Sequence, residues 1–352
     1  MSPHVSDYRE RFTLAGSFVP DDKLVAAGNE LARSLQDFRF RDEIGDTEPT
    51  TFELYTAFAF LLFRNLGCTW AVIETGLGGR LDATNILLPE ASVLTPIELE
   101  HTEILGGTIA LIATEKSKII KQNRPSFSAF QNEDALSVFR SEARSRNSDF
   151  HYLGDYVSSV TDTHIAFKDG YEADLKLRMC GLVQAQNCAL ALLVLRTLGL
   201  YKSGITEKAL EANTLPGRME LVRWDRPLYL DGAHTQNSME ALIETFRKLY
   251  PGRRGICIFG ALSGKNHSAM AASILSAFDT VVVSRPGTYK KSDPKALYEL
   301  LLSMKKPGQT IVLKEEASEA LSYCLEHTGK NDPVLAAGSF YLAGVLKEAL
   351  CR

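Results

Sequence analysis

The sequence predicts an α/β protein of two domains, and three observations support this fold class. The chain has 352 residues, more than one ordinary hydrophobic core holds. From residue 228 onward, short β-branched runs alternate with helical patterns, which is typical of a parallel sheet covered by helices. In the first half, short apolar runs end at glycines or prolines, as buried parallel strands do.

Composition narrows the class of protein. Hydrophobic residues make up 45% and charged residues 23%, which is ordinary for a soluble globular protein. The net charge of −4 favours neither nucleic acid nor an anionic membrane as a partner. The six cysteines form no CxxC pair, which disfavours a zinc site and favours a reducing, cytoplasmic location. The polar N-terminus does not resemble a secretory signal, and no apolar run is long enough to span a bilayer.

In the first half of the chain, predicted helices and strands alternate less regularly than they do after residue 228. A helix over 50–65 is apolar on most faces, so we expect it to be buried and to end at Gly67. Alternation over 152–179 predicts a small antiparallel hairpin region. Further helices are expected over 20–38, 104–121 and 182–198, and strands over 69–75, 91–96 and 125–131.

The segment 214–218 (TLPGR) is a plausible domain junction, so we expect domains over 1–214 and 215–352. Strict alternation of strands and helices follows the junction, and it predicts a parallel sheet with helices on both faces. The expected strands are 228–230, 255–259, 280–284, 310–313 and 333–337, and the expected helices are 238–249, 268–278, 294–302, 316–327 and 341–350.

Residues 74–85 (ETGLGGRLDATN) are the first candidate functional segment. Glu74 ends a predicted strand, and carboxylates at the carboxyl ends of parallel strands are well placed to hold a hard cation. An ordinary tight turn explains the glycines equally well. A dinucleotide fingerprint does not fit, because Leu81 occupies the third glycine position.

Three other segments contain candidate side chains. His101 lies close to carboxylates just after a predicted strand and could ligate a divalent ion, although a lone loop histidine is more often a surface or packing residue. Lys116 lies on a predicted helix, where lysines are usually solvated. Arg218 at the junction could pair with phosphate, and the Asp231–His234 turn could hold polar groups at a sheet edge. Residues 260–266 (GALSGKN) lack the spacing and the hydroxyl of a phosphate-binding loop.

The order and spacing of these motifs together are more specific than any one of them. They resemble the successive motifs of folylpolyglutamate synthase and dihydrofolate synthase, which are Mur-ligase-type enzymes, from Ser2 to about Leu346. The resemblance implies an N-terminal P-loop-NTPase-type sheet domain and a C-terminal Rossmann-like domain. The motifs are SPHVSDYRERF, VIETGLGGRLDATNI, TPIELEHTEILG, IATEKSKIIK, PGRMELV, LYLDGAH and AAGSFYLAGVL.

The resemblance also implies roles for individual residues. Ser2, Glu74 and His101 match magnesium ligands. Lys116 matches a lysine that is commonly carbamylated and supports the metal site, and His234 matches a residue at the active-site face of the C-terminal domain; we assign both as catalytic. The remaining matches are nucleotide contacts at Asn187, Arg218 and Asp231, and the pterin-binding loop at Asp82.

The implied activity is that of an ATP-dependent acid–amino-acid ligase of folate biosynthesis. ATP would phosphorylate a folate or pteroate carboxylate, and the amine of L-glutamate would attack the acyl phosphate, with Mg²⁺ offsetting negative charge. Mg²⁺ and ATP are therefore the expected cofactor and co-substrate. We expect a cytoplasmic monomer.

The sequence departs from the family pattern in one large respect. The family's P-loop normally precedes the SPH motif, and Met1 lies inside that motif, so we expect the domain to lack its first βα unit and to have an open position in its sheet. Thr235 also stands where the family usually has asparagine, on the glutamate side of the site. Two alternatives remain: a non-catalytic, ligase-derived folate- or nucleotide-binding protein, and a Mur-type ligase for another carboxylate and amine.

Overall fold

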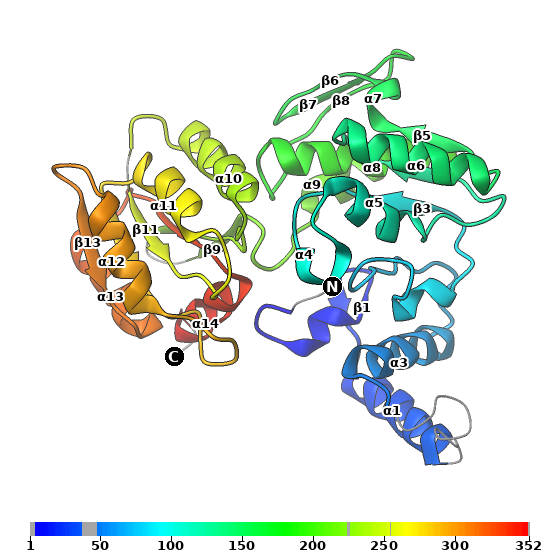
Figure 1. Cartoon of the computed structure of the whole chain (residues 1–352), viewed down its shortest axis with the longest axis horizontal. Coiled ribbons are helices and arrows are strands. Elements are labelled where there is room, and N and C mark those ends of the chain that lie inside the picture. Colours follow the sequence, from blue (N-terminus) through cyan, green and yellow to red (C-terminus); the bar gives the residue numbers. More distant parts are fainter. Residues whose placement is uncertain (1–3, 37–47, 224–225, 254, 351–352) are drawn as a thin grey trace. The chain divides into compact units, whose positions relative to one another are not determined.

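The computed structural model describes residues 4–36, 48–223, 226–253 and 255–350 (Figure 1). The chain forms two compact units. The first comprises Arg9–Ser158 and Leu190–Leu200, and the second comprises Ser159–Ala189 and the chain from Tyr201 onward, with a short N-terminal segment up to Tyr8. None of the helices in the described ranges has the length and apolar character needed to cross a membrane.

The first unit begins with a helical pair. Helices α1 (Asp21–Gln36) and α3 (Thr51–Asn65) lie side by side (Figure 1). Phe12, Val19 and Leu62 are buried in the hydrophobic cluster that these helices share. The start of α3 is set by a capping box, in which the Thr50 hydroxyl accepts from the Glu53 amide and the Glu53 carboxylate accepts from the Thr50 amide. The expectation that α3 is buried was wrong, since most of its side chains are only half-buried.

A three-stranded parallel sheet forms the centre of the first unit. Its order is β3 (Ser92–Leu94), β4 (Ser126–Ser128) and β5 (Phe150–Tyr152). Helices α5 (Ile109–Ser117) and α6 (Glu133–Ser145) pack together, and they bury Ala113 and Phe139 in one core with Leu94.

Two sequence predictions in this unit were wrong. Residues 69–75 form no strand, and Trp70 and Val72 are exposed, because no neighbouring strand in the described chain pairs with this segment. The single helix expected over 104–121 is two helices, α4 (Thr102–Leu105) and α5. They are separated at Gly106, whose φ of 104° is incompatible with a right-handed helix, and Thr108 caps the second one.

The predicted antiparallel region over 152–179 is confirmed. It is a three-stranded sheet in the order β6-β7-β8, with β7 and β8 paired antiparallel across the Asp169–Gly170 turn. Helix α8 (Leu182–Thr197) follows it, close to its predicted bounds, and α9 (Thr206–Ala212) comes next. The strands are β6 (Val157–Val160), β7 (His164–Phe167) and β8 (Glu172–Asp174).

A six-stranded sheet dominates the second unit, in the order β13-β12-β11-β14-β10-β9. All its neighbours are parallel except β9, a short edge strand that pairs antiparallel with β10 and was not predicted. The strands are β9 (Glu220–Arg223), β10 (Pro227–Leu230), β11 (Ile256–Phe259), β12 (Thr280–Val283), β13 (Thr310–Leu313) and β14 (Val334–Ala337).

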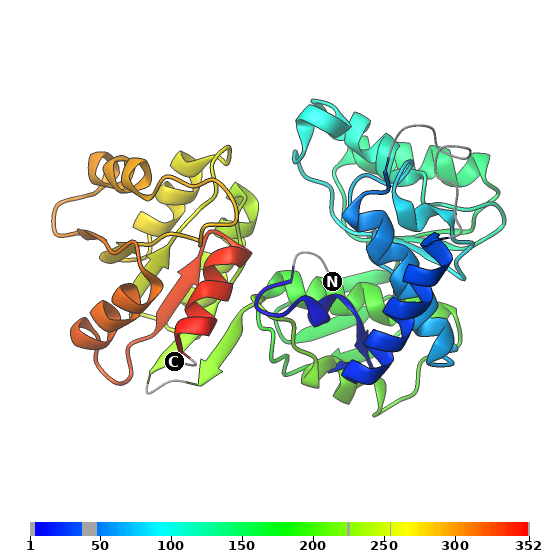
Figure 2. The same cartoon turned by 90° about the horizontal axis from the view of Figure 1, so that it is seen from below.

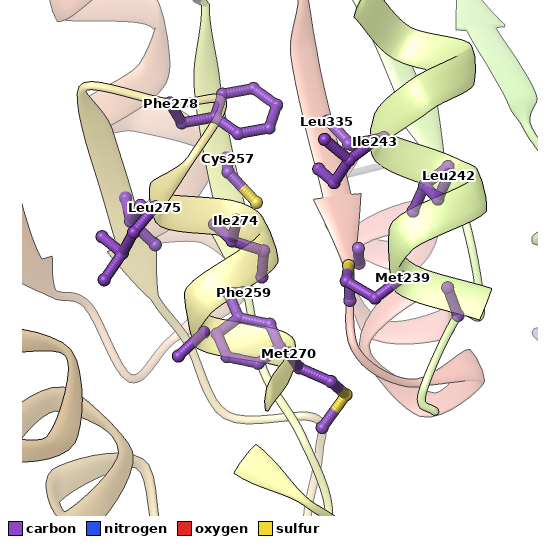
Figure 3. Close-up of a cluster of buried hydrophobic side chains, with 14 of the residues drawn as sticks. Met239, Leu242, Ile243, Cys257, Phe259, Met270, Ile274, Leu275, Phe278 and Leu335 are labelled. Atoms are coloured by element: carbon purple, nitrogen blue, oxygen red, sulfur yellow. The ribbon is translucent and has the colours of Figure 1, made fainter. Parts of the chain in front are cut away.

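Helices cover both faces of this sheet, as the alternation predicted (Figure 2). On one face, α10 (Gln236–Leu249), α11 (His267–Leu275) and α12 (Pro294–Met304) bury side chains against the strands. Figure 3 shows Met239 and Ile243 of α10 facing Cys257 of β11 and Leu335 of β14. The other face carries α13 (Ala317–His327) and α14 (Phe340–Leu350).

Candidate functional site

The strand order of the six-stranded sheet reverses at β14. The chain runs from β11 to β12 to β13 across the sheet and then returns to β14, which lies between β10 and β11. Ligands of open α/β sheets bind outside the carboxyl ends of the strands where the order reverses in this way. Asp231 directly follows β10, and Gly338 directly follows β14, so both lie at this edge.

Asp231 is the buried carboxylate of this edge. One of its oxygens accepts a hydrogen bond from the Met219 amide at 2.8 Å, and the other accepts from the Ala233 amide at 2.8 Å. Burial raises the pKa of Asp231, while the two amides and the charges of Arg218 and His234 oppose that shift. The structure therefore brings two of the predicted residues, Arg218 and His234, close to a third, the buried Asp231.

His234 and Arg218 are each held by neighbours from the same edge. The His234 Nδ1 lies 2.8 Å from the Gly232 carbonyl oxygen, which can only accept, so Nδ1 carries the proton and the lone pair of the neutral ring is on Nε2. The Arg218 guanidinium lies over the Phe340 ring, 4.5 Å from its centroid. Phe340 was not among the predicted site residues, although it lies within the AAGSFYLAGVL motif, directly after the turn that follows a predicted strand.

Asn187 is exposed on α8, and its side-chain amide donates to Gln184 at 3.3 Å. Its predicted nucleotide contact stays a prediction. The rejected phosphate loop at 260–266 is an ordinary connection: its Ser263 amide donates to the Lys291 carbonyl, and Asn266 caps α11 by accepting from the Ala269 amide.

In the first unit, Asp82 organises the glycine-rich turn. One carboxylate oxygen accepts from the amides of Gly76 and Leu77, both at 2.9 Å. The other accepts from the Thr84 amide at 3.0 Å and from the Thr84 hydroxyl at 2.6 Å. All four hydrogen bonds are donated to the Asp82 side chain by residues of its own loop, so Asp82 stabilises the conformation of that loop.

The same turn lies against α5. The Arg80 amide donates to the Glu115 carbonyl at 3.0 Å, and the Arg80 guanidinium pairs with the Glu115 carboxylate at 3.1 Å. The next residue, Lys116, is half-buried; desolvation lowers its pKa, and the charges of Glu100 and Asp82 act against that shift. The glycine-rich turn and Lys116 thus form one local structure.

The predicted magnesium ligands are not seen as a cluster. Glu74 and His101 are both exposed, and His101 has a φ of 53° at the start of α4. Ser2 lies outside the described residues. Within the described ranges, no three or more His, Cys, Asp or Glu side chains gather as metal ligands. The magnesium site stays a prediction.

A cavity of about 140 Å³ in the first unit was missed by the sequence analysis. Glu74 and Thr84 lie on its wall, and its lining is otherwise rich in aromatic rings from α3 and the segment before β1 (Thr13–Leu14). The one sequence feature that could have indicated this cavity is the number of aromatic residues on α3. The aromatic rings that line the cavity belong to Phe12, Phe52, Tyr55, Phe60 and Phe63.

Comparison with known proteins gives a consistent result. A model of the Mur ligase glutamate ligase domain matches residues 217–340, the segment that contains Arg218, Asp231 and His234. The dihydrofolate synthase/folylpolyglutamate synthase of Bacillus subtilis is 30% identical over 364 residues, covering 99% of this chain and 83% of the relative.

Solved structures agree with this match and confirm the predicted α/β, Mur-ligase-like fold. The Mycobacterium tuberculosis folylpolyglutamate synthase complexed with ADP and AMPPCP aligns with a TM-score of 0.88 and 26% identity, covering 100% of this chain and 84% of that one. The E. coli FolC in complex with DHPP and ADP aligns with a TM-score of 0.84 and 25% identity, covering 100% and 81%. The chain therefore belongs to the folylpolyglutamate synthase/dihydrofolate synthase family of Mur-type ligases.

Proposed function

We propose that this protein is an ATP-dependent ligase that joins the amine of L-glutamate to a carboxylate of a folate or dihydropteroate. The observation that carries the proposal is the buried Asp231, held by two backbone amides beside Arg218 and His234 at the point where the strand order reverses. Membership of a family of ATP-dependent ligases supports the same reaction, and complexes of relatives with ADP support ATP as the co-substrate.

The reaction proceeds in two steps. The substrate carboxylate attacks the terminal phosphorus of ATP, which forms an acyl phosphate and releases ADP. The amine of glutamate then attacks the acyl carbon, an amide bond forms, and phosphate leaves with the bonding electron pair. The amine must lose a proton, and the Nε2 of His234 is the basic nitrogen of a ring whose orientation Gly232 fixes.

Arg218 and Asp231 have complementary roles toward the nucleotide. The Arg218 guanidinium is a planar donor suited to phosphate or to the face of a base. Each Asp231 oxygen accepts one backbone hydrogen bond and keeps a further lone pair, which suits a donor such as a sugar hydroxyl. We assign both residues, with Asn187, to nucleotide binding.

In the first unit, Mg²⁺ held by Ser2, Glu74 and His101 would offset negative charge on the phosphoryl group. Lys116 has a lowered pKa, so its amine is more often neutral than that of an exposed lysine, and a neutral amine can react with CO₂ to give a carbamate and a proton. The aromatic cavity beside Glu74 supports a flat heteroaromatic substrate, and the turn held by Asp82 forms part of its wall through Thr84.

A turnover assay tests the proposal. The protein is incubated with ATP, Mg²⁺, L-glutamate and either dihydropteroate or tetrahydrofolate, and phosphate release and product mass are measured. We expect phosphate release that depends on both glutamate and pteroate, with a product one glutamyl residue heavier. Pteroate binding in a calorimeter without turnover would instead identify a non-catalytic binding protein, and turnover with a different amine would identify a ligase of other specificity.

A further inference from the structure

The Phe340 side chain occupies the centre of the site in the second unit. It is the first residue of α14, directly after the turn that follows β14, and only 9% of it is exposed. A phenylalanine at a helix start could simply fill the core. Phe340 does belong to the buried cluster under α13 and α14, but its ring also contacts a cation, an imidazole and two glycine backbones.

The cation is Arg218, whose guanidinium carbon lies 4.5 Å from the centroid of the Phe340 ring. A guanidinium within about 6 Å of an aromatic face is attracted by the negative charge of that face. The His234 ring meets Phe340 edge to face, with 6.2 Å between the centroids and 62° between the planes. One ring therefore contacts two of the side chains proposed to act on the reactants.

Glycines at two backbone positions leave the space that the Phe340 ring occupies. A Cβ atom on Gly232 would overlap the Phe340 ring, and a Cβ on Gly217 would lie 3.1 Å from it. The two glycines are also bonded to each other, since the Gly232 amide donates to the Gly217 carbonyl at 2.8 Å. Gly217 directly precedes Arg218, and Gly232 supplies the oxygen that fixes His234, so movement of the ring would disturb both side chains.

We propose that Phe340 is a positioning residue of this site, whose ring holds the Arg218 guanidinium and the His234 imidazole in one fixed arrangement. The inference rests on the proposed function in that Arg218 is taken as a nucleotide contact. It goes further because it assigns a positioning role to an aromatic side chain at the start of α14, an element that contains neither Arg218 nor His234. This role requires the aromatic face of the Phe340 ring and not only its apolar volume.

The test compares Phe340→Leu, which keeps apolar volume but loses the aromatic face, with Phe340→Tyr, which keeps that face. The ADP dissociation constant is measured by calorimetry on the whole protein, without other substrates. We expect Phe340→Leu to weaken ADP binding roughly 3- to 10-fold, the range of a partly buried cation–π contact, and Phe340→Tyr to bind within about 2-fold of the wild type. In the turnover assay, Phe340→Leu should raise the KM for ATP by a similar factor.

A matched control separates positioning from folding. Phe278 is a fully buried phenylalanine of the same unit, in the core drawn in Figure 3, and belongs to a different hydrophobic cluster from Phe340, so Phe278→Leu should lower the melting temperature without weakening ADP binding. The inference is overturned if Phe340→Leu binds ADP as the wild type does, if Phe340→Tyr binds as weakly as Phe340→Leu, or if the wild type binds no ADP. Wild-type ADP binding without glutamate-dependent turnover contradicts the proposed ligase activity alone, because the positioning effect is read from binding.

Discussion

Replacing Asp82 with alanine removes the acceptor of four hydrogen bonds inside the glycine-rich turn. The donors respond differently, according to their exposure. Gly76 and Leu77 are exposed, so water can replace the carboxylate at their amides. Thr84 is 9% exposed, so its amide and hydroxyl lose their partner inside the protein. A buried donor left without a partner costs about 1–3 kcal/mol.

For Asp82→Ala, the two Thr84 donors therefore predict a local destabilisation of about 2–4 kcal/mol, allowing for non-additivity. Asp82→Asn is milder. Its side-chain oxygen still accepts from the Gly76 and Leu77 amides, and its NH₂ group can donate to the Thr84 hydroxyl oxygen, so the hydroxyl keeps one hydrogen bond in the reverse direction while the Thr84 amide loses its acceptor. The expected cost of Asp82→Asn is about 1–2 kcal/mol.

Native-state hydrogen exchange measures this local stability directly. The Thr84 amide should exchange roughly 30- to 700-fold faster in Asp82→Ala than in the wild type, and Asp82→Asn should lie between them. Asp155→Ala is the matched control, because the Asp155 side chain is 61% exposed and water can replace its partners. Its effect should stay within about 0.5 kcal/mol. Wild-type exchange at Thr84 in Asp82→Ala would refute the reasoning.

Three further predictions concern other parts of the site. Burial raises the pKa of Asp231 above its unfolded value, so lowering the pH from 7 toward 4 should stabilise the wild type relative to Asp231→Asn. Urea unfolding of both proteins measures this, and a difference in their free energies of unfolding that does not change with pH would contradict it. Gly79→Ala would place a Cβ 2.7 Å from a carbonyl oxygen of α5 and should cost about 1–3 kcal/mol, whereas Gly107→Ala, with open space around it, should cost little; equal melting temperatures would exclude the clash. With ¹³C-labelled bicarbonate, we expect a carbamate NMR signal that Lys116→Arg abolishes and Lys118→Arg retains, and loss of the signal in both variants would exclude Lys116 as its specific source.

The second unit shows what local pattern can predict. Its strands β11 and β14 are buried at every position, so they appear in the sequence as short, continuous apolar runs. The helices between these runs can be predicted from the helical period of their apolar residues and from capping residues such as Asp293, which precedes Pro294. The edge strand β9 was missed because its residues carry no such run, and its pairing with β10 depends on a neighbour in space.

The first unit shows where local pattern is insufficient. Residues 69–75 have the composition of a buried strand, yet Val72 is fully exposed, because a strand requires hydrogen-bonding neighbours and the described chain supplies none beside it. The composition of a segment indicates that it could form a strand. Whether it does depends on a neighbouring strand in the folded protein that can pair with it. The same holds for α3, whose apolar faces are only half-covered.

By itself, the sequence determined the α/β class, the run of strands and helices after residue 226, and the order of motifs that marks the family. These properties depend on residues close together in the chain. Only the tertiary structure showed that Asp82 is used to hold its own loop, that Asp231 lies beside Arg218 and His234, and that the Phe340 ring joins the last two. Those contacts join residues up to 122 positions apart, and their distances follow from the packing of the sheet, which no local pattern encodes.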